Sequence, residues 1–165
     1  MEAREIPAET HAQYRMSWIA YLGPIVGLLL MIAVGVALLV YDQFAATGVL
    51  LWIGIAVIVV ALTIFIYRVL MIHSVVLYTD DHGVWVYSGI LPWSKGVAGV
   101  KWRDLEDAIY VTGFFSWLLK SYKVRVGHRF TKTSEIVLDN IAHGNEAVEH
   151  INGLHRQALG GGPVE

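Results

Sequence analysis

The chain has 165 residues, of which 16% are charged, and a mean hydropathy of +0.55. Soluble domains carry about 25% charged residues, so this composition indicates that one part of the chain is adapted to lipid. The absence of cysteine excludes disulfides, thiolate metal sites and cysteine nucleophiles, and a net charge of −2 gives no basic surplus for nucleic-acid binding.

Charged residues are distributed unevenly along the chain. Residues 1–72 hold seven charged side chains, whereas residues 73–165 hold nineteen. We therefore expect one membrane module followed by one small soluble domain. The predicted parts are an N-terminal cytoplasmic segment, a two-helix transmembrane hairpin, a soluble domain that folds on its own, and a flexible tail, with the bounds 1–15, 16–72, 73–159 and 160–165.

Two uncharged stretches predict transmembrane helices. The first, Trp18–Tyr41, has 24 residues, which as a helix would span roughly 36 Å, enough for a hydrocarbon core of about 30 Å. The second runs from Gln43 to Tyr67. Both are longer than a signal-peptide core, and neither shows the polar face of a soluble surface helix. A short connection between them predicts an antiparallel hairpin.

Basic residues predict the orientation of the hairpin. Arg4 and Arg15 precede the first stretch and Arg68 follows the second, while the connecting loop holds Asp42 and neither Lys nor Arg. Loops that carry Lys and Arg stay on the cytoplasmic side, so both termini are expected in the cytoplasm. We expect a multi-pass protein of the cytoplasmic (inner) membrane.

Gly23 and Gly27 form a small-xxx-small pair in the first span. Such positions let helix backbones approach closely, either within the hairpin or between chains. The pair is therefore a candidate assembly interface as well as a candidate intrachain contact.

After His73, short β-type runs replace the long apolar stretches. They are expected at Ser74–Thr79, Val84–Ile90, Val97–Trp102, Leu105–Thr112, Lys120–Gly127 and Glu135–Leu138, with a seventh near His128–Thr131. The sequence Asp80-Asp81-His82-Gly83 predicts the first turn. A C-terminal helix with Asn145 as its N-cap follows, because Ala147, Val148, Ile151, Leu154 and Ala158 form one apolar stripe.

The runs LYTDDHGVWVYSG, KWRDLEDAIYV, FFSWLLKSYKVRV and EIVLDNIAHGNEAVEHI follow the two spans in that order. This order resembles the bacterial membrane-anchored pleckstrin-homology-like (PH-like) family over roughly residues 70–158. Arg103-Asp104-Leu105 with Ile109, and Ser116-Trp117-Leu118-Leu119, match two family elements, whereas Ser121-Tyr122 stands where the family usually has Gly. The resemblance implies an α+β fold: a PH-like bent antiparallel sheet with a C-terminal helix, serving as a binding or oligomerising scaffold.

Catalytic and metal-binding patterns are absent from the sequence. The seven histidines are scattered without metal-ligand spacing, and we interpret them as surface side chains. The paired acids near Asp80 and Asp104 are explained by a turn and by a solvated strand connection. No nucleophile elbow, Walker loop or zincin motif is present. We expect no enzyme activity, no cofactor and no metal.

The stretch Ile109–Ser134 contains no acid. Its cations, Lys120, Lys123, Arg125, Arg129 and Lys132, form a candidate face for anionic headgroups or an acidic partner. Phe114, Phe115 and Trp117 precede them. We interpret these rings as core or as an assembly interface, because the family pattern places them inside the fold; an interfacial membrane contact is the alternative.

These patterns favour a membrane-tethered, non-catalytic PH-like interaction module that assembles with itself or with another membrane protein. One alternative is an anionic phospholipid headgroup-binding domain, and another is an accessory subunit of a membrane enzyme or transporter. The expected partners are membrane lipid and a protein in the same membrane, without nucleic acid.

Overall fold

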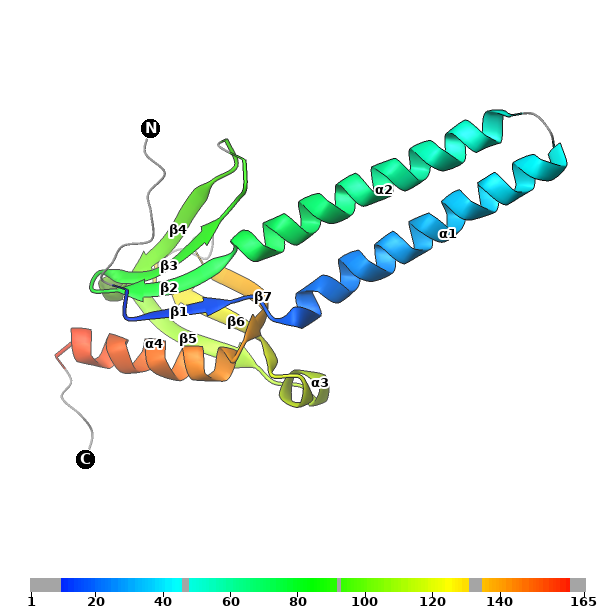
Figure 1. Ribbon diagram of the computed structural model, residues 1–165. Coiled ribbons are helices and arrows are strands. Elements are labelled where there is room, and N and C mark those ends of the chain that lie inside the picture. The colour runs from blue at the N-terminus through cyan, green and yellow to red at the C-terminus, as the bar shows by residue number, and fades with distance from the viewer. Residues whose placement is uncertain (1–9, 46–47, 92, 131–134, 161–165) are drawn as a thin grey trace. The chain divides into compact units, whose positions relative to one another are not determined.

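The computed structural model describes residues 10–45, 48–91, 93–130 and 135–160. It separates into two compact units (Figure 1). One unit, here called the hairpin, comprises Ala20–Ile72; the other, here called the sheet domain, comprises the residues before and after it. The chain is thus α+β, as expected. The predicted flexible tail lies almost entirely outside the described residues.

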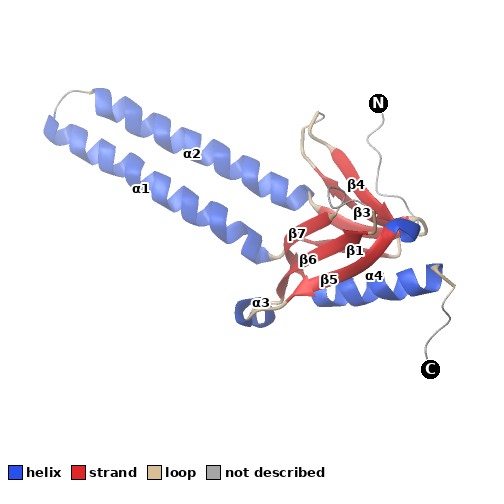
Figure 2. Cartoon of the chain, turned by 180° about the vertical axis from the view of Figure 1, so that it is seen from behind, coloured by secondary structure: helices blue, strands red, loops and turns tan. Residues whose placement is uncertain are grey.

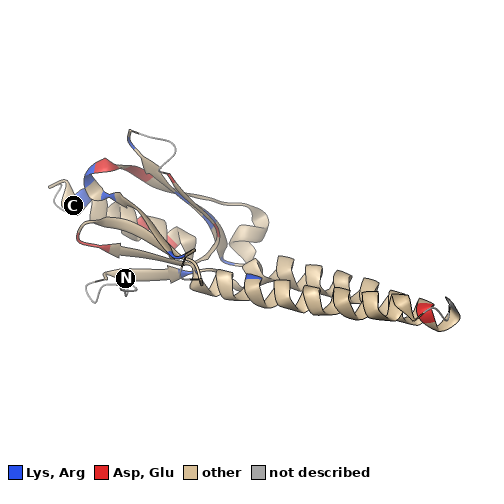
Figure 3. Cartoon of the chain, turned by 90° about the horizontal axis from the view of Figure 1, so that it is seen from above, with Lys and Arg blue, Asp and Glu red and all other residues tan. Residues whose placement is uncertain are grey.

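The hairpin consists of two long apolar helices, α1 (Leu22–Ala45) and α2 (Val49–Ser74). Both are long and apolar enough to cross a membrane. Only 6% and 11% of their most apolar stretches are buried by the rest of the chain, so these helices do not form the core of a soluble fold. Charged side chains are sparse along both helices (Figure 3).

The close contact between the two helices uses Gly35 and Gly54. A Cβ atom placed on Gly54 would lie 2.9 Å from the carbonyl oxygen of Gly35, and one placed on Gly35 would lie 2.5 Å from Ile58 Cγ1. Ala61, two helical turns beyond Gly54 along α2, is also buried. Small residues are therefore required at this crossing so that the backbones can approach.

The sheet domain contains two antiparallel sheets and one long helix (Figure 2). The first sheet has the order β1 (Ala12–Arg15), β2 (Val76–Asp80), β3 (Gly83–Ser88), β4 (Gly96–Lys101). The second has the order β5 (Leu105–Val111), β6 (Ser121–His128), β7 (Ile136–Ala142). A 3-10 turn, η1 (Trp18–Tyr21), follows β1, and η2 (Trp102–Asp104) joins the sheets.

Six strands lie where the sequence predicted them, and the β2–β3 turn is confirmed. The Asp80 side chain accepts hydrogen bonds from the backbone N–H groups of His82 (2.8 Å) and Gly83 (2.9 Å). In addition, the Trp102 indole N–H donates to the Asp80 carbonyl oxygen at 3.0 Å. The acids at this turn therefore have a structural role.

The seventh strand is not where it was expected. His128 ends β6 and no strand follows it among residues 129 and 130, the described part of that expectation. Instead β1, from the N-terminal segment, pairs with β2 in the register Ala12↔Thr79 to Arg15↔Val76. The expected domain boundary at residue 73 leaves this strand out.

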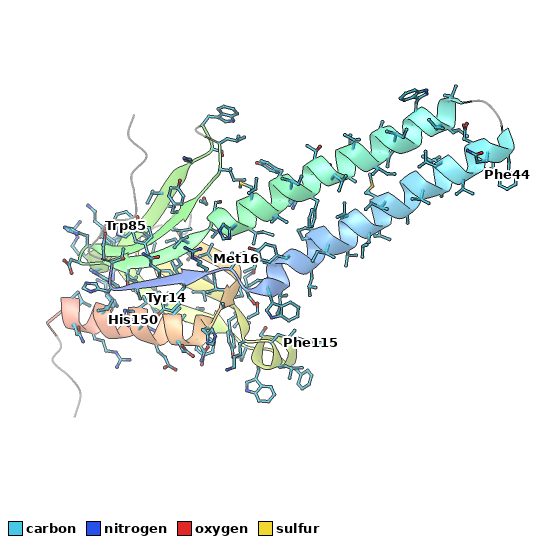
Figure 4. The ribbon with its side chains drawn as sticks, viewed as in Figure 1. Tyr14, Met16, Phe44, Trp85, Phe115 and His150 are labelled. Atoms are coloured by element: carbon cyan, nitrogen blue, oxygen red, sulfur yellow. The ribbon has the colours of Figure 1, made fainter. Side chains whose placement is uncertain are left out.

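The N-terminal strand also reaches the second sheet. Met16 forms a bridge with Ile141, and the Ser17 N–H donates to the Asn140 carbonyl oxygen at 2.6 Å. Tyr14 and Met16 pack against the core between the sheets (Figure 4). β1 thus links the edge of the first sheet to β7 of the second.

The C-terminal helix α4 (Gly144–Ala158) covers the second sheet and buries Ala147, Val148 and Ile151, as the apolar stripe predicted. Leu154 is partly buried on the core, whereas Ala158 is exposed. The prediction of Asn145 as N-cap is wrong: the cap position is His143, in a left-handed conformation with φ of 53°. Helix α4 therefore begins two residues earlier than expected, at Gly144, where an added Cβ atom would lie 2.8 Å from Tyr122 and from Val124 of β6.

Asn152 of α4 fixes the helix to β5. Its side chain accepts a hydrogen bond from the Ala108 N–H (3.0 Å) and donates one to the Ala108 carbonyl oxygen (2.9 Å). The register of β5 shifts between Leu105 and Ala108, so the amide side chain satisfies backbone groups at an irregular point of the strand.

Candidate interaction surfaces

The predicted basic face lies on β6 and at its two ends. Lys123 and Arg125 are exposed while Tyr122, Val124 and Val126 are buried, which confirms the predicted alternation of the strand. Lys132 lies outside the described residues. Lys120 precedes β6 and Arg129 follows it, so the whole strand, with nine residue steps or roughly 30 Å, separates these two cations.

The two central cations are paired with acids. Lys123 Nζ lies 3.0 Å from Asp139 Oδ1 on β7. Arg125 donates from Nε and Nη2 to the two carboxylate oxygens of Glu135, both at 2.9 Å, and these hydrogen bonds raise the pKa of Arg125. Both acids come after the acid-free stretch in the sequence, and the pairing of β7 with β6 brings them beside the two cations. The face is therefore close to neutral at its centre.

This pairing predicts that removing both ion pairs changes lipid binding little. In the full chain, Lys123→Gln with Asp139→Asn and Arg125→Gln with Glu135→Gln should retain anionic phospholipids as the wild type does, because each pair is locally neutral and exposed pairs are screened by salt. Native mass spectrometry with anionic and zwitterionic lipids measures this retention. Selective loss of anionic lipid from the variant would instead support the hypothesis that β6 recognises anionic headgroups.

The aromatic segment forms a short exposed helix, α3 (Phe114–Leu118), between β5 and β6. Phe114, Phe115, Trp117 and Leu118 are between 55% and 72% exposed. The interpretation that these rings are core, inside the fold, is wrong. Phe115 projects away from the sheets (Figure 4). The segment is therefore an exposed apolar surface of the kind that contacts a protein partner or lipid.

An open groove of about 430 Å³ adjoins α3 within the sheet domain. Leu118, Leu119 and Lys120 line one side, and Met16 and Trp18 line another. His143 also lines the groove, and its Nδ1 atom lies 3.1 Å from Glu146 Oε1. The groove therefore brings together the residues just before the first long apolar helix and the end of α3, which are about a hundred residues apart in the chain.

The Gly23 and Gly27 pair is not used by the contact between α1 and α2. A Cβ atom at either position would meet nothing within 4 Å, in contrast to Gly35 and Gly54. The two glycines instead open a cavity of about 330 Å³ within the hairpin. Its other lining residues are Pro24, Leu28, Met31, Ala61, Ile64, Phe65 and Arg68.

The histidines include one with a packing role. The His155 ring stacks on Trp102, with centroids 6.4 Å apart and planes at 22°, and burial lowers the pKa of His155. This histidine is therefore partly buried rather than a free surface side chain. Among the described residues, no three His, Asp or Glu side chains gather at metal-binding distance.

Comparison of the chain with protein-family models, curated proteins and solved structures gave no match.

Proposed function

We propose that this protein is a membrane-tethered, non-catalytic PH-like interaction module that assembles with itself or with another membrane protein. The observation that carries the proposal is the position of the hairpin between β1 and β2, two strands that pair with each other. The sheet domain is thereby attached to the apolar helices through two neighbouring strands, as a domain held at a bilayer surface would be.

The strand pairing also supports the proposed topology. Because β1 and β2 belong to one sheet, the chain before α1 and the chain after α2 lie on the same side of any membrane. An even number of crossings is therefore required, and two helices of 24 and 26 residues supply two. With Arg15 and Arg68 flanking the spans, the proposed side is the cytoplasm.

The arrangement of strands supports the PH-like assignment. A four-stranded sheet, a three-stranded sheet and a C-terminal helix follow one another, and the core lies between them. Asp80 holds the β2–β3 turn, and His155 packs on Trp102. We therefore assign this scaffold to binding, which is the use that the family resemblance implies.

The open face at Gly23 and Gly27 supports assembly within the membrane. Lipid tails are as apolar as leucine, so helices associate there by close packing at small residues. Here the space beside the two glycines, between α1 and α2, is left unfilled by the chain's own side chains. We propose that a helix of a second copy, or of another membrane protein, packs on it.

Intact-mass measurement of the full chain in a gentle detergent tests this assembly. Gly27→Ile should shift the protein from its complex to the monomer, because a branched side chain fills the face that the partner helix needs. Ala33→Ile is the control, since Ala33 is an exposed small residue elsewhere on α1 and its enlargement should leave the complex intact.

Each outcome of this measurement is informative. A complex with twice the chain mass indicates self-assembly, and a complex with an added polypeptide indicates a dedicated partner, including an enzyme or transporter to which this chain is accessory. A wild-type monomer in every mild detergent would contradict the proposal.

The proposed orientation is tested by thiol labelling, which is clean because the chain has no cysteine. Gln43→Cys, in the last turn of α1, should react with a membrane-impermeant reagent in intact cells. Glu149→Cys, on the exposed face of α4, should react only after lysis. The reverse pattern would place the sheet domain outside. The cysteine on α4 is not placed at Asn152, because that side chain makes two hydrogen bonds with the backbone of Ala108 on β5.

A further inference from the structure

Trp18 belongs both to the groove of the sheet domain and to the first apolar stretch. It is 57% exposed and lines the groove beside Leu118 and Leu119. It is also the first residue of the apolar stretch that is long enough to cross a membrane. If that stretch spans the bilayer, which is part of the proposed function, chain continuity holds Trp18 at the boundary between water and lipid.

Helix α3 must then lie at the same boundary, because it shares the groove with Trp18 inside the sheet domain. Its exposed rings, Phe114, Phe115 and Trp117, are of the types that form the apolar face of segments lying in the membrane interface. Lys120 follows directly, and residues 108–130 contain no acid. The composition of this surface complements an anionic bilayer surface.

A protein partner fits this surface less well. The side-chain area of a Phe or Trp residue is roughly 150–250 Å². Because Phe114, Phe115 and Trp117 are 66–72% exposed, the three rings together present roughly 300–500 Å². A stable protein interface needs about 800 Å² from each partner. A lipid surface has no such requirement, since it adapts to an isolated apolar protrusion and continues past it to Trp18.

We infer that α3, together with Trp18, inserts into the headgroup region of the same bilayer that the hairpin crosses. The contact would be a third point of attachment beside α1 and α2, and it would hold the sheet domain in one orientation against the membrane. The occupant of this surface is phospholipid, and the neighbouring Lys120 faces the phosphate layer.

Fluorescence quenching in vesicles tests the inference with the full chain. Single cysteines are introduced by Phe115→Cys, Ser116→Cys, Leu30→Cys and His82→Cys, and each carries an environment-sensitive fluorophore. The vesicles contain anionic phospholipid with a quencher placed either near the headgroup or at the end of the acyl chain. Leu30 lies in the middle of α1, and His82 lies in the β2–β3 turn, at the end of β1 opposite Trp18.

The inference predicts strong shallow quenching and weak deep quenching at positions 115 and 116. The label at position 30 should show the reverse, and the label at position 82 should show neither. Adding Phe115→Ser and Trp117→Ser to the Ser116→Cys chain should remove most of the shallow quenching. This comparison separates the insertion of α3 from the affinity of the fluorophore itself.

The controls separate the inference from the proposed function. Deep quenching at position 30 without quenching at positions 115 and 116 would overturn the inference and leave the membrane tether intact. A lack of quenching at position 30 would overturn the tether and the inference together. A third outcome also overturns the inference. If the labels on α3 are shielded from water but not quenched by lipid, and become exposed when the protein is diluted, then a second copy of the chain covers α3.

Discussion

Replacing Ile151 by Asp is expected to unfold the sheet domain while leaving the hairpin helical. Ile151 is fully buried on α4 and belongs to the core formed with Leu105 and Val126. The substitution removes an apolar side chain and buries a carboxyl group without a partner. Together these effects cost about 4 kcal/mol or more, a large part of the 5–15 kcal/mol that stabilises a typical domain.

Two controls make the test for Ile151 specific. Ile151→Val should cost only about 0.5–1.5 kcal/mol, because it removes one methyl group from the same site. Val137→Asp places the same charge on an exposed apolar position of β7 and should change stability little. The measurement is near-ultraviolet circular dichroism and limited proteolysis of the full chain in detergent. A folded Ile151→Asp protein would mean that α4 does not close this core.

Removal of β1 is the second change with a large expected effect. A chain that begins at His73 lacks the strand that pairs with β2, the bridge from Met16 to Ile141, and the packing of Tyr14 and Met16. We expect it to melt without cooperativity. This differs from the expectation that residues 73–159 fold on their own, which depended on the apolar patterns after residue 73.

A rejoined chain provides the matched comparison for β1. Because Arg15 pairs with Val76 in an antiparallel register, Ser17 and Ser74 lie at the same end of the strand pair. A short Gly-rich linker can therefore replace the hairpin, and the rejoined chain should be soluble and melt cooperatively. Adding Tyr14→Gly and Met16→Gly should abolish the cooperative melt. Equal stability of the rejoined chain and the chain from His73 would contradict a structural role for β1.

The sequence predicted those elements whose signal is local. The two apolar stretches, six strands and the stripe on α4 are each visible within a short window, because the alternation of buried and exposed residues is a property of the segment itself. β1 has only four residues, and its partner strand begins roughly sixty positions later, so no local pattern marks it.

The surfaces were less predictable than the elements. Phe114–Leu118 has a composition typical of a core, and only the three-dimensional structure shows that its large side chains are exposed with respect to the described residues. The basic stretch contains no acid, but the pairing of β7 with β6 places Asp139 and Glu135 beside its central cations. In both cases the residues of the segment do not reveal what lies beside it in the fold.

The insertion of the hairpin between β1 and β2 has a consequence for biosynthesis. At 5–20 residues per second, the ribosome completes β1 about 3–12 s before β2 exists, so the first strand must wait unpaired until both spans have been made. In the proposed topology, a nascent chain that crossed the bilayer only once would leave the two strands on opposite faces, and the four-stranded sheet could not close. Completion of the sheet would then require that both helices have crossed the membrane.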